Sequence, residues 1–283
     1  MVAPWKIHSQ FLKQKTTSTI LKLFTNRTWL QYRAIATKQH QTYEEYTQKG
    51  HYQQSDWLQR WKMKTPRWQL KQVHSHLIQY YESHLKNDQD TKSNIFIPLC
   101  GKSLDMIWLA EKGNRVVGVE VVQQPCHDFF IEHNIQYDVK SLPDNLGQLM
   151  RSQVSGLDIL IYNCDYFALT QPILGFALDS VWDRGSFVAI NPSQRCQYAK
   201  HLHSLMAPNA PGLVITLDYD INARPESGPP FCVPDDIIQT VFSPYANIQK
   251  LSSEVITGER VTQYEGLTSM DESTFYLQFN HER

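Results

Sequence analysis

The sequence lacks any apolar run near the length of about 20 residues that a membrane-spanning helix requires. It also has little net charge, because 27 Lys and Arg residues balance 28 Asp and Glu residues and leave a formal net charge of −1. These absences argue against a transmembrane protein and against general electrostatic attraction to nucleic acid or to an anionic membrane. We therefore expect neither nucleic acid nor a membrane as partner. As separate expectations, the protein is a monomer and its partner is a small molecule.

Cysteine is scarce, and no two cysteines are spaced as a C-x-x-C pair. The five are Cys100, Cys126, Cys164, Cys196 and Cys232. An odd, widely spaced set argues against a disulfide framework and a zinc knuckle, and it favours a reducing compartment, the cytoplasm. The pairs His74/His76 and His201/His203 lack the neighbouring ligands that would complete a metal site. We expect no metal and interpret these histidines as solvated residues on helix faces.

Acidic residues are absent from the first 43 positions, which carry seven Lys or Arg residues before the first carboxylate at Glu44. This pattern predicts a basic, disordered extension over residues 1–43, followed by one folded domain over residues 44–283. Such extensions also resemble mitochondrial transit peptides, which are amphipathic, contain Arg and lack acids. A mitochondrial location is therefore the alternative to the cytoplasm.

The glycines of two phosphate-binding motifs are missing as well. The stretch PLCGKS ends like a P-loop, but Phe96 stands where that loop needs a glycine, five positions before Gly101. Gly101 is also the only glycine of the G-x-G-x-x-G pattern that binds NAD. Glu120, however, ends the apolar run VVGVE nineteen residues after Gly101, where an acid can accept hydrogen bonds from ribose hydroxyls. A ribose-binding acid without phosphate-binding glycines indicates S-adenosylmethionine, which has no phosphate.

Apolar runs and helical patterns alternate along the chain after residue 93. The predicted strands cover residues 94–99, 115–122, 157–164, 177–183, 212–220 and 274–280, and the predicted helices cover residues 103–112, 125–134 and 193–206. This alternation predicts an α/β fold with a doubly wound, mostly parallel sheet. Upstream, SDWLQRW places Trp57 and Trp61 on one helix face. The pair Thr65-Pro66 predicts the start of a second helix that runs to about residue 85.

Several motifs, in one order along residues 54–283, resemble the thiopurine S-methyltransferase family, a class of S-adenosylmethionine-dependent enzymes. They are W-x-x-x-W at Trp57 and Trp61, PLCGKSLDMIWLAEKG, VVGVE, WDRGSFVAINP and GPPF-x-VP. The resemblance implies a class I, Rossmann-like fold: a seven-stranded sheet with helices on both faces and an N-terminal helical cover over the cofactor. Trp68 stands where the family has phenylalanine, and Asp165-Tyr166 is closer to the Asp-Phe of bacterial members than to the Ser-Ile of vertebrate members.

The resemblance also implies a role for each matching residue. Arg184 and Arg260 would be the catalytic residues, with Arg260 in contact with the substrate. The residues that would bind the cofactor are Trp57, Trp61 and Trp68 as its cover, Leu99 in the first turn, Glu120 at the ribose, Asp165 and Tyr166 beside the adenine, and Arg184 in the active site.

These observations predict methyl transfer from S-adenosylmethionine to the sulfur of an aromatic or heterocyclic thiol, without a metal. A thiolate is already a strong nucleophile, so the enzyme mainly needs to align it, and a nearby positive charge favours the ionised form. Two alternatives remain open. One is a methyltransferase for other small thiols or for halide, thiocyanate or selenide-type nucleophiles, and the other is a non-catalytic nucleotide-binding Rossmann protein.

Overall fold

The computed structural model describes residues 51–64, 66–86, 92–224 and 228–280. The predicted extension over residues 1–43 and the predicted helix start at Thr65 lie outside these residues. Within the described residues, no helix is both long and apolar enough to cross a membrane.

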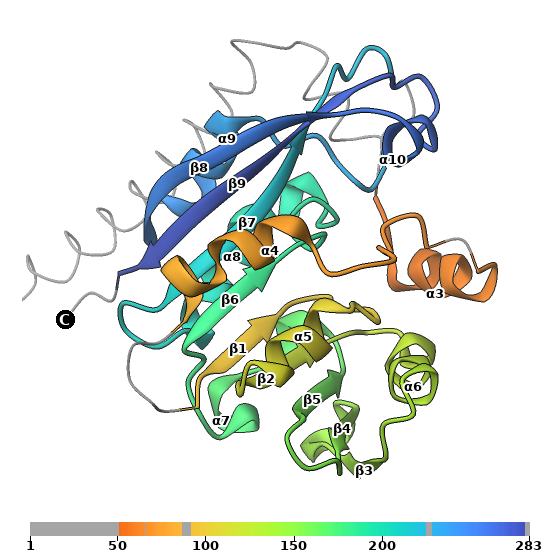
Figure 1. Cartoon of the computed structure of the whole chain (residues 1–283), viewed down its shortest axis with the longest axis vertical. Coiled ribbons are helices and arrows are strands. Elements are labelled where there is room, and N and C mark those ends of the chain that lie inside the picture. The colour runs from red at the N-terminus through yellow and green to blue at the C-terminus, as the bar shows by residue number, and fades with distance from the viewer. Residues whose placement is uncertain (1–50, 65, 87–91, 225–227, 281–283) are drawn as a thin grey trace, which may run out of the picture.

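One nine-stranded sheet, in the order β3-β4-β5-β2-β1-β6-β7-β9-β8, forms the centre of the fold (Figure 1). Its strands are β1 (Asn94–Ile97), β2 (Arg115–Val119), β3 (Tyr137–Ser141), β4 (Gln148–Ser152), β5 (Asp158–Asn163), β6 (Ser180–Asp183), β7 (Pro211–Asp218), β8 (Ala246–Ile256) and β9 (Met270–Phe279). The neighbours β5, β2, β1, β6 and β7 are all parallel, whereas β9 is antiparallel to both β7 and β8. The predicted doubly wound, mostly parallel sheet is confirmed.

The predicted strand number of seven is wrong, because a hairpin extends the sheet at one edge. Strands β3 and β4 pair antiparallel with each other, and β4 pairs antiparallel with β5. Without this hairpin the order is the expected seven strands. The side chains of β3 are mostly exposed and polar, so this strand carries none of the apolar pattern that marks a buried strand.

Helices cover both faces of the sheet, because side chains alternate along each buried strand. On β1, Ile95 and Ile97 face one apolar core and Phe96 faces the other. The first face is covered by α4 (Ser75–Tyr80), η1 (Tyr81–Leu85), α5 (Asp105–Glu111) and α6 (Gln123–Glu132). The second is covered by η3 (Tyr166–Ala168), α7 (Gln171–Leu174), α8 (Arg195–Leu205) and α9 (Asp235–Phe242). Short turns η2 (Pro143–Asn145) and η4 (Pro192–Gln194) complete the connections, and α10 (Glu259–Thr262) lies between β8 and β9.

The N-terminal part of the described chain departs from the predicted pair of helices. Helix α3 (Gln54–Lys62) carries Trp57 and Trp61 as expected and stands beside the sheet rather than on either face (Figure 1). The second helix begins at Ser75, not after Thr65, and residues 66–74 form turns and extended chain. Trp68 in that segment packs edge-on against the rings of Trp57 and Trp61, at centroid distances of 5.3 and 5.5 Å. The helix was predicted from the 3.6-residue spacing of apolar residues, and that spacing does not reveal the contacts of Trp68 with α3.

The interpretation of His74 and His76 as solvated histidines is also wrong. Their exposed fractions are 2% and 1%. The Nδ1 atom of His76 lies 2.7 Å from the Thr274 hydroxyl of β9, and the Nδ1 atom of His74 accepts the main-chain N–H of His76 as a helix cap. Both residues therefore belong to the interface between α4 and the sheet.

Asp105 at the start of α5 joins three parts of this interface. Its buried carboxylate accepts the main-chain N–H of His74 at 2.9 Å and the indole N–H of Trp182 in β6 at 2.8 Å. The indole and the main-chain N–H are both inside the protein, where a donor without an acceptor loses the free energy of its hydrogen bond to water.

Replacing Asp105 with alanine should therefore destabilise the fold strongly. Two buried donors would lose their acceptor, at about 1–3 kcal/mol each, so we expect the free energy of unfolding to fall by about 2–6 kcal/mol. Urea denaturation followed by circular dichroism measures this value. Asp138→Ala, at an exposed position of β3, should stay within about 0.5 kcal/mol of the original protein. Equal stability of the two variants would contradict the role given to Asp105.

Candidate active site

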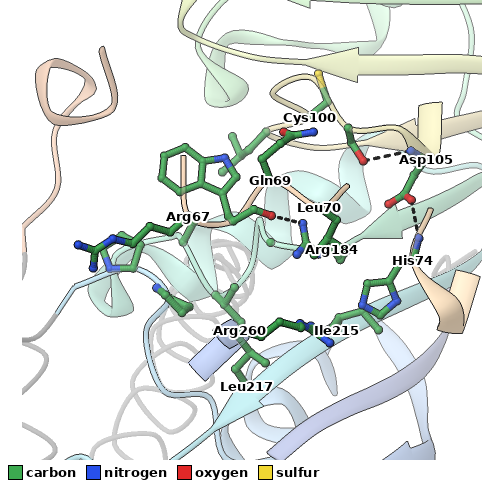
Figure 2. Close-up of a pocket in the computed structure, with 18 of the residues that line it drawn as sticks. Arg67, Gln69, Leu70, His74, Cys100, Asp105, Arg184, Ile215, Leu217 and Arg260 are labelled. Atoms are coloured by element: carbon green, nitrogen blue, oxygen red, sulfur yellow. Dashed lines mark hydrogen bonds between the residues drawn. The ribbon is translucent and has the colours of Figure 1, made fainter. Parts of the chain in front are cut away.

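The carboxyl ends of the parallel strands open into a cavity of about 480 Å³. Leu99 follows β1, Glu120 follows β2, Arg184 follows β6 and Leu217 lies near the end of β7. Much of the remaining lining comes from the two ends of the described chain. One side is formed by α3 and residues 67–75, and the other by Ile256, Glu259, Arg260, Gln263, Tyr264, Met270 and Glu272. Figure 2 shows Cys100 at one end of this cavity and Arg260 with Leu217 at the other.

Glu120 lies at the end of the cavity near Cys100, which is called the first end below. Its carboxylate accepts the main-chain N–H of Gly101 at 3.1 Å and that of Val122 at 2.8 Å. These two bonds leave acceptor capacity on both oxygens, enough for a pair of ribose hydroxyls. Burial raises the pKa of Glu120 to about 7, and the main-chain donors only partly offset that effect. The residue therefore changes its charge near neutral pH.

Tryptophan side chains cover this end of the cavity. The main chain at Gly101 has a φ of +51°, and a Cβ atom there would lie 3.1 Å from the ring of Trp61. The glycine thus allows both the left-handed turn and the close approach of the indole. Trp57 and Trp68 line the same space. Aromatic faces attract a cation, so this end suits a nucleoside that carries a sulfonium charge.

Arg184 lies on the turn after β6, near enough to Glu272 and Arg260 for their charges to act on its pKa. The preceding Asp183 is fully buried and organises this turn, since its carboxylate accepts the N–H of Phe187 at 3.0 Å and the hydroxyl of Tyr198 at 2.6 Å. Burial raises the pKa of Asp183 to about 6, against these hydrogen bonds. Arg184 donates to the main-chain oxygen of Trp68 at 2.6 Å. Burial lowers the pKa of Arg184, and the nearby charge of Asp105 opposes that shift.

Arg260 and Glu272 form an ion pair at the second end. The Nη2 atom of Arg260 lies 2.6 Å from Oε2 of Glu272, and Nη1 lies 3.4 Å from Oε1. Burial opposes ionisation of Glu272, but the neighbouring His74 and Arg260 outweigh it and lower the pKa of Glu272 to about 2. Apolar side chains of Ile215 and Leu217 complete the walls there. This end therefore combines apolar surface with two guanidinium groups and one carboxylate that stays ionised.

Comparison with known proteins shows the family to which this chain belongs. A family model described as Thiopurine S-methyltransferase matches residues 52–280. The chain belongs to the thiopurine S-methyltransferase family. A thiopurine S-methyltransferase of Psychrobacter cryohalolentis is 40% identical over 71% of this chain and 89% of its own length. Those of Pseudomonas fluorescens and Rattus norvegicus are 36% and 34% identical, over 78% and 72% of this chain and 96% and 83% of their own lengths.

Solved structures show the same fold at low sequence identity. An S-adenosylmethionine-dependent methyltransferase of Methanosarcina mazei is 13% identical, with a TM-score of 0.51, over 74% of this chain and all of its own length. A protein studied in the conversion of a disulfide bond into a thioacetal group during echinomycin biosynthesis is 14% identical, with a TM-score of 0.54, over 76% of this chain and 85% of its own. The class I methyltransferase fold is confirmed by these structures. Family membership confirms the enzyme class and the use of S-adenosylmethionine.

The cavity brings together most of the residues that the family resemblance singled out. Its lining includes Trp57, Trp61, Trp68, Leu99, Glu120, Arg184 and Arg260. Asp165 and Tyr166 are not among the described residues that line it: Asp165 is exposed and caps η3, and the ring of Tyr166 is buried between Phe96 and Tyr198. The placement of these two beside the adenine stays a prediction.

Several lining residues were not assigned to the site from the sequence, among them Gln69, His74 and Glu272. Gln69 donates to the main-chain oxygen of Lys102 and so attaches the cover to the turn after β1. His74 and Glu272 lie in segments that carry no recognisable motif. Glu272 is flanked by Asp271 and Ser273 in β9, and it meets Arg260 only where α10 lies beside that strand. No group of three or more His, Cys, Asp or Glu side chains in the described part of the chain is arranged to hold a metal ion.

The raised pKa of Glu120 predicts pH-dependent binding of the nucleoside. Glu120 is ionised above its pKa of about 7 and loses its charge as the pH falls through that value. The affinity for S-adenosylhomocysteine, the demethylated product, should then fall by up to about tenfold per pH unit below pH 7. Isothermal titration calorimetry between about pH 5.5 and 8.5 covers the range in which this carboxyl group titrates.

Two variants separate Glu120 from other titrating groups. Glu120→Gln should bind S-adenosylhomocysteine about tenfold more weakly at high pH, because it lacks the charged acceptor, and should show no such slope. Glu111→Gln, on the exposed part of α5, should keep the slope of the original protein. Parallel slopes in the Glu120→Gln variant and the original protein would exclude Glu120 as the titrating group.

Proposed function

We propose that this protein transfers the methyl group of S-adenosylmethionine to the sulfur of an aromatic or heterocyclic thiol. The observation that supports this most directly is the composition of the cavity. A carboxylate with free acceptor capacity at Glu120 lies at one end, and apolar walls with Arg184 and Arg260 lie at the other. A flat, apolar ring that bears a negative sulfur fits the second end.

The residues of the second end favour a thiolate over other nucleophiles. The positive charges of Arg184 and Arg260 stabilise an anion and so lower the pKa of a bound thiol. Glu272 is a poor proton acceptor because its pKa is about 2. A phenol or an amine would therefore keep its proton, whereas an aromatic thiol ionises near neutral pH.

The reaction needs alignment rather than a base. S-adenosylmethionine supplies an electrophilic methyl group on a positively charged sulfur. The thiolate uses one electron pair to form the new S–C bond while the bond between the methyl carbon and the sulfonium sulfur breaks and leaves its pair on that sulfur. The proton of the thiol has left to solvent before this step. We propose that Arg184 and Arg260 orient the thiolate and that Trp68 limits the access of water.

We also propose the finer assignments that follow from the sequence. The protein works as a monomer in the cytoplasm on a small-molecule thiol, and its near-zero net charge supports the absence of nucleic acid and membrane partners. Residues 44–283 form the methyltransferase domain, and residues 1–43 form a basic extension, with a transit peptide as the alternative. The cofactor roles of Trp57, Trp61, Trp68, Leu99, Glu120, Asp165, Tyr166 and Arg184 belong to the same proposal.

A panel of nucleophiles tests the proposed substrate class. With tritiated S-adenosylmethionine, we expect methyl transfer to benzenethiol and to heteroaromatic thiols and almost none to phenol, catechol or aniline. Thiocyanate, iodide and selenide belong in the panel because the sequence left such nucleophiles open. Preferential transfer to a catechol, an amine or a halide would overturn the proposal while leaving the fold and the co-substrate unchanged.

Replacing Arg260 with glutamine should impair the use of thiols but not of the co-substrate. The variant loses a charge that stabilises the thiolate, so we expect kcat/KM for benzenethiol to fall by at least about tenfold, the value of a charge-assisted hydrogen bond. The rise of kcat/KM with pH should move to higher pH, because the bound thiol ionises less readily.

Controls for this variant concern binding and charge. The affinity for S-adenosylhomocysteine should change by less than about twofold, the scatter of substitutions outside a binding site. Arg151→Gln removes a charge from an exposed position of β4 and should leave kcat/KM unchanged. An equal loss in the two arginine variants, or an unchanged pH profile in Arg260→Gln, would exclude Arg260 from the thiol site.

A further inference from the structure

Asn163 is the last residue of β5 and lies beside the turn that carries Glu120, but it is not among the described residues that line the cavity. Its side-chain nitrogen donates to the main-chain oxygen of Glu120 at 2.8 Å and to that of Val121 at 3.1 Å. Both of these neighbours are acceptors, so the amide group must face them with its nitrogen rather than with its oxygen. The orientation of this side chain is therefore fixed by its contacts.

One peptide unit connects Asn163 with the carboxylate of Glu120. The unit between Val121 and Val122 presents its oxygen to Asn163, and its N–H donates to the Glu120 carboxylate at 2.8 Å. A trans peptide unit is planar, so its C=O and N–H groups point in opposite directions. The bond that holds the oxygen therefore also sets the direction of the N–H. Hydrogen bonds in such a chain polarise one another, so the bond from Asn163 strengthens the bond to the carboxylate.

The hairpin of β3 and β4 fixes the main chain of Asn163. Gln148 at the start of β4 pairs with Asn163, and a Cβ atom on the preceding Gly147 would overlap with the main-chain oxygen of Asn163. Gly147, with a φ of +141°, thus allows the hairpin to approach this closely. The side chain of Gln148 also accepts a hydrogen bond from Gln123, which directly follows the turn of residues 120–122. The hairpin therefore contacts both Asn163 and the segment that Asn163 holds.

We infer that Asn163 is a positioning residue of the co-substrate site. Its amide holds the turn after β2, so that the Glu120 carboxylate faces the ribose hydroxyls of S-adenosylmethionine. Asn163 acts through Glu120 and touches neither the co-substrate nor the thiol. This inference rests on the proposed role of Glu120 at the ribose. It also gives the β3–β4 hairpin a function, which is to support this side of the nucleoside site.

Asn163→Ala tests the inference, because it removes the donor without adding a charge. Isothermal titration calorimetry measures the affinity for S-adenosylhomocysteine and for an analogue that lacks both ribose hydroxyls. At about pH 8.5, Glu120 with its pKa of about 7 is ionised. We expect the variant to bind S-adenosylhomocysteine about tenfold more weakly, the effect of one hydrogen bond. It should bind the analogue almost as well as the original protein does, whereas a general loss of structure would weaken both ligands equally.

A double-mutant cycle shows whether Asn163 acts through Glu120. In the Glu120→Ala background, Asn163→Ala should lower the affinity for S-adenosylhomocysteine by less than about threefold, because effects within one hydrogen-bond network are not additive. The inference alone would be overturned by an undiminished loss in that background, by an equal loss for the two ligands, or by unchanged binding in Asn163→Ala. Unchanged binding by Glu120→Ala would instead remove Glu120 from the ribose site, and the inference with it.

Asn114→Ala is the matched control. Asn114 lies at the opposite end of β2 from Glu120, and its buried amide also donates two hydrogen bonds, to the main-chain oxygen of Leu109 and to the hydroxyl of Tyr81, both at 2.8 Å. This substitution should lower the melting temperature at least as much as Asn163→Ala does, but it should leave the ratio of the two affinities unchanged. A ratio that follows the melting temperature in both variants would show that Asn163 is structural only.

Discussion

The parallel direction of β5, β2, β1, β6 and β7 is the constraint on which the rest of this structure depends. Because these strands run the same way, their carboxyl ends meet at one edge, and each turn there delivers a group to the same cavity. Leu99 and Gly101 lie in the turn after β1, Glu120 follows β2, and Arg184 follows β6.

The cavity at that edge is covered by two segments, one before β1 and one between β8 and β9. Arg67, before the first strand, donates to the main-chain oxygen of Gln263, and the amide of Gln263 donates to the main-chain oxygen of Arg67. Gln69 adds a bond to the turn after β1. Reciprocal hydrogen bonds between residues that are 196 positions apart in the sequence thus close the cavity.

Two glutamates in this cavity show how the surroundings set the chemistry of one side chain. Glu120 is stabilised only by main-chain N–H groups, so burial dominates and raises its pKa to about 7. Glu272 is also buried, but Arg260 and His74 lower its pKa to about 2. The first carboxylate keeps acceptor capacity for hydroxyl groups, and the second has its charge balanced by Arg260. The same residue type thus gives a carboxyl group that titrates near neutral pH at the nucleoside end and a carboxylate that stays ionised at the thiol end.

Local sequence patterns predicted those parts of the fold that a single apolar run or a single motif is enough to identify. The apolar runs at residues 94–99 and 115–122 correspond to β1 and β2, and Gly101 and Glu120, which the spacing paired, are joined by a hydrogen bond. The patterns failed where contacts distant in sequence decide. Residues 66–74 have a helical period, yet the contacts of Trp68 with α3 hold them in a non-helical path. Glu272 meets Arg260 only because β9 pairs with β8 and returns beside α10, which no local pattern encodes.

One hydrogen bond connects the two ends of the active site. The guanidinium of Arg184 donates to the main-chain oxygen of Trp68 at 2.6 Å, and the indole of Trp68 packs on Trp61, which lies against Gly101. A charge-assisted bond of this kind is about twice as strong as a neutral one. Displacement of the tryptophan cover would break this bond and release Arg184 from its position in the cavity. The group that faces the thiol is therefore held in place by the same segment that covers the nucleoside, so the two binding steps share one structural element.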